Sequence, residues 1–155
     1  RAPCDADTQY ATRSTQYVTR HTIAREDRAM DKIRILIVDD DTSLLQLLED
    51  GIEMFCAGCQ VTSATDSLSA LEHLRLQPYD LVLTDYDMPG MNGLELAQTV
   101  RQALPRARVV LMTAYGDGAA FQDRIRARQL DAYLRKPFSL KQVRDIVQAT
   151  AAAAA

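Results

Sequence analysis

Short apolar runs alternate with helix-periodic segments through most of this 155-residue chain. A strand expected at 33–38 precedes a helix expected at 42–55, whose apolar stripe comprises Leu44, Leu47, Leu48, Gly51, Ile52 and Phe55. The unit occurs five times, and the further strand and helix pairs are 60–64 and 67–76, 80–84 and 94–103, 108–112 and 119–128, and 132–134 and 140–149. Right-handed crossovers place helices on both faces of a sheet, so this pattern predicts an α/β fold with a five-stranded parallel sheet. A closed barrel would need eight units.

The two ends of the chain depart from this pattern. Residues 1–31 are polar and lack periodicity, so we expect a disordered or loosely ordered extension ahead of one domain at 32–149. Met30 directly precedes the first apolar run, and residues 1–29 are therefore either an added extension or the chain's own leader. The alanine-rich tail at 150–155 either continues the last helix or is a placeholder. We expect a stand-alone domain or one part of a larger protein.

The overall charge is nearly balanced, with 18 basic and 21 acidic residues and a net charge of −3. This balance gives no whole-chain argument for binding to nucleic acids or membranes. The sequence contains neither the roughly 18 consecutive apolar residues of a membrane span nor the apolar segment of a secretory signal. We therefore expect a cytoplasmic protein without a membrane partner.

Three cysteines, Cys4, Cys56 and Cys59, form an odd and sparse set for a disulfide scaffold. Cys56 and Cys59 have the spacing of a redox pair, but they follow the first expected helix and do not begin one. No helix N-terminus is then available to stabilise a thiolate, so we expect inert thiols. A zinc site would need about four ligands, and His21 and His73 lie at no ligand spacing from the pair.

Polar side chains follow four of the expected strands at the point where each strand ends. These residues are Asp39 and Asp40 after the first strand, Asp85 and Asp87 after the third, Thr113 after the fourth, and Lys136 after the fifth. Ligands bind beyond the carboxyl ends of parallel strands, where the strand order reverses. Carboxylates gathered there repel one another unless a cation joins them, so the sequence predicts a divalent metal site.

Each of these residues also has an ordinary structural explanation. The acidic residues at 39–41 could cap the following helix, with Asp41 or Thr42 as the expected cap. Those at 85 and 87 could form a turn, and Thr113 or Lys136 alone would be unremarkable. Their joint occurrence at one edge of one sheet favours a functional site.

Four motifs carry a resemblance to a known family: VDDD at 38–41, TDYDMPGMNG at 84–93, LMTA at 111–114 and YLRKPF at 133–138. In this order and spacing they resemble the receiver domain of bacterial two-component response regulators, over about residues 32–149. The resemblance implies a flavodoxin-like (βα)5 fold with strand order 2-1-3-4-5. It also implies a phosphorylation-activated signalling switch.

The resemblance assigns roles residue by residue. Asp85 is the expected phosphoacceptor and a ligand of Mg²⁺. The other expected roles are a direct Mg²⁺ ligand at Asp40, a water-mediated ligand at Asp39, a ligand at the backbone carbonyl of Asp87, charge neutralisation by Lys136, a switch hydroxyl at Thr113 and a switch aromatic ring at Tyr133. The chain would be a phosphoacceptor with self-catalysed phosphotransfer and autodephosphorylation, not a turnover enzyme.

The resemblance also implies partners. The expected donor is a sensor histidine kinase or a phosphotransfer protein. The output surface, which could also form a homodimer, would combine the helix at 119–128, the strand at 132–134 and the helix at 140–149. Basic residues near this surface lack the aromatic interleaving of a nucleic-acid interface, so we expect no direct nucleic-acid binding.

Three local features complete the prediction. Asp87 and Tyr115 flank the expected path of the hydrolytic water, which leaves the lifetime of the phosphorylated state open. The loop at 128–131 lacks the glycine that the family usually has there. The Lys136–Pro137 peptide bond is expected to be cis.

Two alternatives remain open at this point. The segment around Asp85 also resembles haloacid dehalogenase-like phosphatases, with Asp85 as nucleophile and Asp87 as acid–base. Those enzymes place the nucleophile on the first strand, whereas here an acidic cluster precedes it, and this order favours a receiver. A receiver-like scaffold that only binds partners is disfavoured by the complete acidic set.

Overall fold

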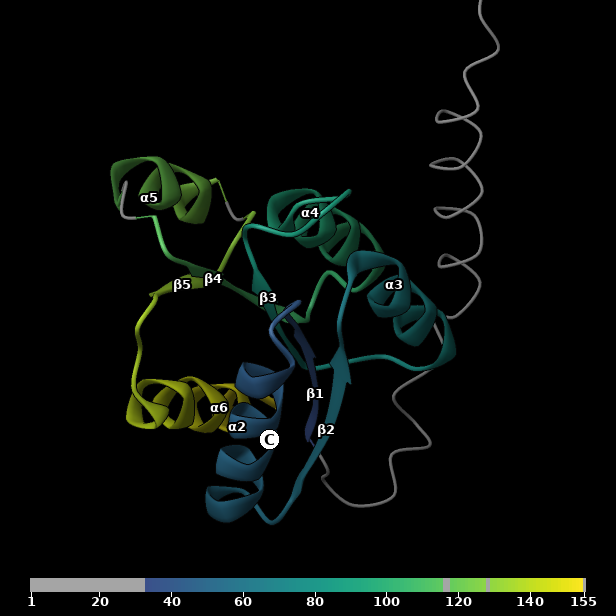
Figure 1. Cartoon of the computed structure of the whole chain (residues 1–155), viewed down its shortest axis with the longest axis vertical. Helices are drawn as coiled ribbons and strands as arrows, with labels where there is room; N and C mark the ends of the chain where they lie inside the picture. The colour runs from purple at the N-terminus through teal and green to yellow at the C-terminus, as the bar shows by residue number, and fades with distance from the viewer. Residues whose placement is uncertain (1–32, 116–117, 128, 155) are drawn as a thin grey trace, which may run out of the picture.

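Five parallel strands form the central sheet in the computed structural model, which describes residues 33–115, 118–127 and 129–154 (Figure 1). The extension expected at 1–31 lies outside the described residues. The strands are β1 (Ile33–Val38), β2 (Cys59–Ala64), β3 (Leu81–Asp85), β4 (Arg108–Thr113) and β5 (Ala132–Arg135). Their order is β2-β1-β3-β4-β5, which confirms the predicted topology.

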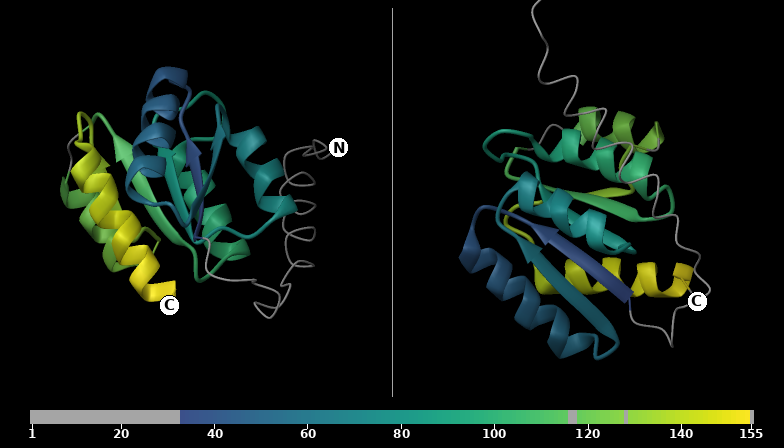
Figure 2. Two further views of the ribbon diagram at one scale, coloured as in Figure 1. Left: turned by 90° about the horizontal axis from the view of Figure 1, so that it is seen from below. Right: turned by 90° about the vertical axis from the view of Figure 1, so that its right-hand side faces the viewer.

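In the part of the chain that the structure describes, five helices cover the two faces of the sheet (Figure 2). They are α2 (Thr42–Phe55), α3 (Ser67–Leu76), α4 (Gly93–Ala103), α5 (Gly118–Arg126) and α6 (Leu140–Ala154). Helices α2 and α6 pack on one face, and α3, α4 and α5 pack on the other. Among the described residues, no helix is both long and apolar enough to cross a membrane.

The core lies in two layers because successive side chains of a strand point to opposite faces. In β1, Ile35 and Ile37 pack toward α2 and α6, whereas Leu36 and Val38 pack toward the other three helices. Both faces are covered, so β1 has no solvent-facing side, which explains its nearly continuous apolar sequence.

The helix boundaries follow from local chemistry. Asp41 is the N-cap of α2, as predicted, and its carboxylate accepts hydrogen bonds from the backbone N–H groups of Ser43 and Leu44. Asn92 and Glu95 form a reciprocal capping box at the start of α4. The last helix extends to Ala154, beyond the expected end at 149, because alanine has the highest helix propensity.

One prediction about the buried face of α2 is wrong. Leu47 was expected in the core but is 54% exposed, whereas Leu45 is 4% exposed. The sheet contacts a stripe centred on Leu45, Leu48 and Ile52, at the i, i+3, i+7 spacing of a helix face. The consecutive leucines allow either stripe in the sequence, and only packing against the sheet selects one.

The prediction that the cysteines are free thiols is also wrong for two of them. Cys56 and Cys59 are joined by a disulfide, with their Cα atoms 5.4 Å apart. Cys56 is the C-cap of α2, and Cys59 begins β2. The prediction relied on the missing helix N-terminus, which affects the reactivity of a thiolate but not whether the turn brings two sulfurs together.

Candidate functional site

Three carboxylates converge at the carboxyl edge of the sheet. One oxygen each from Asp39, Asp40 and Asp85 lies within 4.8 Å of the others. The register causes this, because Val38 pairs with Thr84 and both strands therefore deliver their next residues to the same edge. Asp39 is 0% exposed and Asp85 is 5% exposed, whereas Asp40 is open to solvent. The predicted convergence of distant acidic residues is present.

Lys136 joins two of these carboxylates. Its Nζ lies 2.7 Å from Oδ2 of Asp39 and 2.9 Å from Oδ1 of Asp85. The backbone N–H of Lys136 donates to the carbonyl of Thr113, and the Lys136–Pro137 peptide bond is cis, as expected. When all groups are ionised, three carboxylates and one ammonium leave a net charge of −2, which a divalent cation would neutralise.

The environment shifts the protonation of both partners. Burial raises the pKa of Asp85 above its ordinary value; the hydrogen bond from Lys136 opposes this rise, and the Asp39 charge adds to it. Burial alone would lower the pKa of Lys136, but hydrogen bonds and charges from Asp39 and Asp85 outweigh burial and raise it. Lys136 therefore remains a cation beside the buried carboxylates.

Backbone contacts hold Asp39 in place. Its Oδ1 accepts a hydrogen bond from the backbone N–H of Asp41 at 2.9 Å, while its Oδ2 contacts Lys136. The backbone N–H of Asp39 donates to the carbonyl of Ala64 at the end of β2. Both carboxylate oxygens of Asp39 thus have a protein partner, whereas the carboxylate of Asp40 faces solvent.

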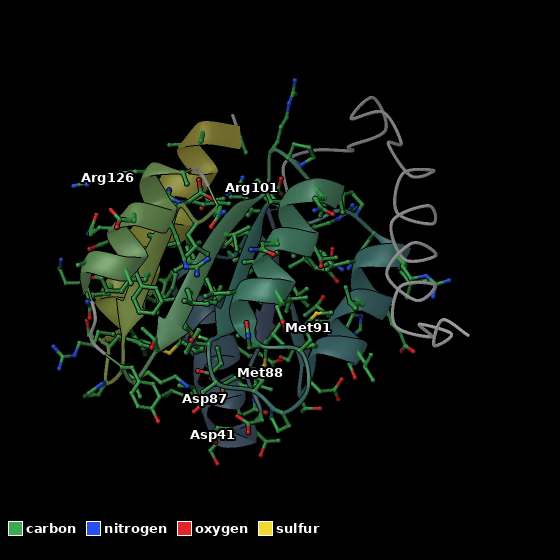
Figure 3. The ribbon with its side chains drawn as sticks, turned by 90° about the horizontal axis from the view of Figure 1, so that it is seen from above. Asp41, Asp87, Met88, Met91, Arg101 and Arg126 are labelled. Carbon is green, nitrogen blue, oxygen red and sulfur yellow. A yellow bond between two sulfur atoms is a disulfide. The ribbon has the colours of Figure 1, made fainter. Side chains whose placement is uncertain are left out.

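Two hydrogen bonds anchor the loop between β3 and α4, and Figure 3 shows its residues Asp87 and Met88 at the same end of the molecule as Asp41. The Ser67 hydroxyl donates to the carbonyl of Met91 at 2.6 Å, and the Gly93 N–H donates to the carbonyl of Tyr86 at 3.0 Å. Met88 is buried, whereas the side chain of Asp87 is exposed. The carboxylate of Asp87 therefore lies outside the buried acidic group.

Thr113 is buried at the end of β4, with its hydroxyl bonded within its own loop. The hydroxyl donates to the carbonyl of Tyr115 at 3.1 Å and accepts from the N–H of Tyr115 at 3.0 Å. Tyr115 itself is 62% exposed. The Thr113 hydroxyl has one proton, so it must release the bond that it donates to Tyr115 before it can donate to another group at this edge.

Three aromatic rings link the site to β5. The ring of Tyr133 lies 5.4 Å from that of Phe121 on α5, and Phe121 meets Tyr86 edge-to-face at 5.9 Å. Tyr86 directly follows Asp85, so this row connects the acidic site to the predicted switch ring.

The predicted site did not include Tyr86, Phe121, Ser67 or Gly93. The apolar pattern signals Phe121 only as a core residue. Tyr86 and Gly93 lie within the motif at 84–93, which could have indicated them, whereas Ser67 has no sequence signal of its own.

Comparisons with known proteins agree with this geometry. A family profile described as the response regulator receiver domain matches residues 35–148. A probable chemotaxis protein CheY of Rhizobium etli is 36% identical over 123 residues, covering 77% of this chain and 92% of that protein. Sporulation initiation phosphotransferase F of Bacillus subtilis is 34% identical, covering 74% of this chain and 90% of that protein.

Solved structures show the same fold. A CheY-like receiver domain protein of Methanospirillum hungatei superposes with a TM-score of 0.70 at 26% identity, covering 78% of this chain and 94% of the other. The chemotaxis response regulator CheY4 of Vibrio cholerae gives a TM-score of 0.68 at 25% identity, covering 77% and 98% of the two chains.

Proposed function

The chain belongs to the response regulator receiver domain family, and from this membership we propose that Asp85 is its phosphoacceptor. Receiver domains are phosphorylation-activated signalling switches, and this chain is one of them. The comparisons do not support the alternative of a haloacid dehalogenase-like phosphatase. Individual residues of the acidic edge would carry the separate steps of the switch.

The contact between Lys136 and Asp85 is the observation that carries this assignment. A buried carboxylate with an ammonium 2.9 Å away, next to two further carboxylates, is arranged for more than local packing. Surplus negative charge in a buried cluster of carboxylates destabilises the fold. An ion pair with a purely structural role would not need the additional carboxylates, so their presence indicates another role. A site that receives a phosphoryl group needs this surplus of carboxylates, since they can hold a cation.

Mg²⁺ is the cation that the donor set fits. Mg²⁺ prefers oxygen ligands, keeps several waters, and is held by one or two carboxylates together with phosphate oxygens. Asp40 and Asp85 would bind it directly, and the backbone carbonyl of Asp87 would complete the protein's share. Asp39 would act through water, which suits a carboxylate whose two oxygens already contact Asp41 and Lys136. When bound, the ion would neutralise charge on the phosphoryl oxygens.

The proposed reaction is an in-line displacement at phosphorus. One carboxylate oxygen of Asp85 attacks the phosphorus of a phosphohistidine, or of a small acyl phosphate, while the bond to the leaving nitrogen or oxygen breaks. The leaving group takes the electron pair of that bond, and Asp85 becomes an acyl phosphate. Lys136 stabilises negative charge on the transferred group. Hydrolysis by water would later restore the carboxylate without turnover of any other substrate.

Thr113 and Tyr133 would convert this chemistry into a change of surface. In the structure, the Thr113 hydroxyl binds the backbone of Tyr115. A phosphoryl oxygen on Asp85 would offer a charged, stronger acceptor and draw the hydroxyl inward. The Tyr133 ring, which packs on Phe121, could then move into the vacated space. The response is a population shift of the surface formed by α5, β5 and α6.

The proposed partners follow from the reaction. The donor is a sensor histidine kinase or a phosphotransfer protein, because Asp85 needs an activated phosphoryl group. The surface of α5, β5 and α6 would bind a target or a second copy of the chain. We propose no direct contact between this domain and nucleic acids.

Intact mass spectrometry tests the assignment. After incubation with acetyl phosphate and Mg²⁺, the wild-type chain should gain the mass of one phosphoryl group. The Asp85→Asn variant should gain none, whereas Asp87→Asn, which changes an exposed neighbouring carboxylate, should still gain one. Unmodified wild-type protein, or equal labelling of Asp85→Asn, would remove Asp85 from the proposed role.

A further inference from the structure

The turn between α2 and β2 carries a cysteine pair that phosphotransfer does not use. We propose that Cys56 and Cys59 form a reversible dithiol–disulfide redox site, which exchanges with low-molecular-mass thiols such as glutathione. The two residues are separated by Ala57 and Gly58 and are joined in the structure. This inference is independent of the roles proposed for Asp85 and Lys136.

The backbone of this turn is held by contacts that do not involve sulfur. The N–H of Cys59 donates to the carbonyl of Cys56 at 3.1 Å, and the N–H of Cys56 donates to the carbonyl of Ile52 at 2.8 Å. The N–H of Ile33 donates to the carbonyl of Gly58 at 3.1 Å, which ties the turn to β1. After reduction these hydrogen bonds would keep the two thiols close together, so the bond can form again without a search by the chain.

A purely structural staple is a poor explanation of this disulfide. A disulfide stabilises mainly by restricting the unfolded chain, and this effect grows with the length of the loop that it closes. Cys56 and Cys59 are only three positions apart, so the closed loop is very short. The hydrogen bonds of the turn already fix the same segment. Little stability is therefore left for the sulfur–sulfur bond to add.

The pair lies at the boundary between the core and the exposed surface. Cys56 and Cys59 are partly buried and pack against the core on the side of α2 and α6. The two residues between them are exposed, and Met54 in the last turn of α2 is 88% exposed. One side of the disulfide therefore rests on the core while the surrounding surface is accessible to solvent, as exchange with a dissolved thiol requires.

The exchange balances without any further cofactor. A glutathione thiolate attacks one sulfur of the pair, the sulfur–sulfur bond breaks, and the released cysteine thiolate takes up a proton. A second glutathione thiolate then attacks the mixed disulfide, which frees the other cysteine and forms glutathione disulfide. Two electrons thus pass from two glutathione thiols to the protein disulfide, and the reverse sequence closes the pair again.

The redox site lies at the far end of α2 from the acidic cluster. Asp41 caps the start of α2 beside Asp39 and Asp40, and Cys56 caps its end. The helix has 14 residues, which corresponds to a length of about 21 Å at roughly 1.5 Å per residue. The two sites share no residue, so failure of one assignment leaves the other intact.

Alkylation trapping of the native 155-residue chain tests the proposal. The protein is equilibrated in buffers of graded ratios of reduced to oxidised glutathione, quenched with an alkylating agent, and digested with trypsin. Cys56 and Cys59 fall in one peptide, residues 35–75, and Cys4 falls in another, residues 2–13. As the buffer becomes more reducing, the doubly alkylated fraction of the 35–75 peptide should rise from near zero to nearly all.

Two results would overturn the redox site. Double alkylation at the most oxidising ratio would show that the pair does not close. A pair that resists excess dithiothreitol in the native protein but opens in denaturant would show a shielded structural bond.

Two variants serve as controls. Cys4→Ser should reproduce the wild-type titration. Cys56→Ser should leave Cys59 either alkylated or carrying glutathione at every ratio, because no internal partner remains. If Cys4→Ser abolished protection of the 35–75 peptide, the disulfide would be assigned to the wrong cysteines.

Discussion

A β-carbon added at Gly93 would lie 2.0 Å from the backbone carbonyl oxygen of Asp85. The start of α4 therefore rests directly on the backbone of the proposed phosphoacceptor. The Gly93 N–H also donates to the carbonyl of Tyr86, the residue after Asp85. Any side chain at position 93 must displace the segment that positions the Asp85 carboxylate.

Gly93→Ala should therefore impair both stability and phosphorylation. Overpacking against rigid backbone typically costs about 1–3 kcal/mol, and we expect a loss at the upper end of this range. Urea unfolding and acetyl phosphate labelling measure the two effects. Gly51→Ala is the matched control, because its new β-carbon would meet only the flexible end of Leu140 at 2.7 Å, and alanine favours the helix. Equal stability losses in the two variants would contradict the close-approach argument.

Lys136→Ala should destabilise the protein when no metal is present. It leaves Asp39 and Asp85 buried beside each other without a cation, and we expect a loss of about 1–3 kcal/mol. Lys141→Ala removes an exposed pair with Asp145, which should change the free energy of unfolding by less than about 0.5 kcal/mol. Chemical denaturation of both variants in a chelating buffer decides the point, and similar values for the two would argue against a special role of Lys136.

Asp40→Asn should abolish stabilisation by Mg²⁺ while changing the metal-free protein little. A ligand at 100 times its dissociation constant stabilises a folded protein by about 2.7 kcal/mol, and the wild type should approach this value in excess Mg²⁺. Asp40 is exposed, so its loss in metal-free buffer should cost less than about 0.5 kcal/mol. Thermal unfolding with and without Mg²⁺ measures both effects. The exposed Glu53→Gln on α2 is the control, and it should keep the full response to Mg²⁺.

Asp85→Asn should stabilise the metal-free protein near neutral pH. Burial raises the pKa of Asp85, so the folded protein binds the proton more tightly than the unfolded chain. The contribution of Asp85 thus favours folding below its unfolded pKa and is lost as the pH rises through the folded pKa. The Asp85→Asn variant has no carboxylate to ionise at this position, so it avoids this loss. Its free energy of unfolding should exceed that of the wild type by an amount on the order of 1 kcal/mol at neutral pH, and this difference should shrink in acid. Urea unfolding of the wild type and the variant from neutral to acid pH is the measurement, and a difference that grows in acid would contradict the expected direction.

Asp131→Ala should weaken the fold but leave phosphorylation intact. Its carboxylate accepts hydrogen bonds from the Arg101 guanidinium and from the N–H of Val109 at the start of β4. Loss of these contacts should cost about 1–2 kcal/mol, because Nη2 of the partly buried Arg101 guanidinium and a backbone N–H lose their acceptor, while Nη1 keeps the carbonyls of Pro105 and Ala107. Labelling by acetyl phosphate should persist, since Asp131 precedes β5, at the edge of the sheet opposite Asp85. Asp123→Ala, which removes an exposed pair with Arg126, is the control for a surface charge.

The loop before β5, at 128–131, lacks the glycine expected there, and Asp131 holds the end of this loop in place. Helix α5 ends at Arg126 instead of 128. The carboxylate of Asp131 anchors the end of the loop to β4, and Leu130 is 1% exposed. Neither the hydrogen bond of Asp131 nor the burial of Leu130 could be predicted from the loop sequence, because both depend on how the loop packs against neighbouring elements.

Sequence alone determined the order of the elements and the chemistry of the site. Alternation of strand and helix patterns specified a parallel sheet, and the polar residues at the strand ends specified an acidic edge with one ammonium. These features are local, since each depends on residues near one another in the chain, and a common sheet edge then brings the strand ends together.

Only the tertiary structure decided which side chains touch. It selected Leu45 over Leu47 for the buried face of α2, and it closed the disulfide between Cys56 and Cys59. It also required glycine at position 93, because a backbone carbonyl from another element occupies the space of a side chain. Such contacts depend on how separate elements pack in three dimensions, and no periodicity along the chain encodes those distances.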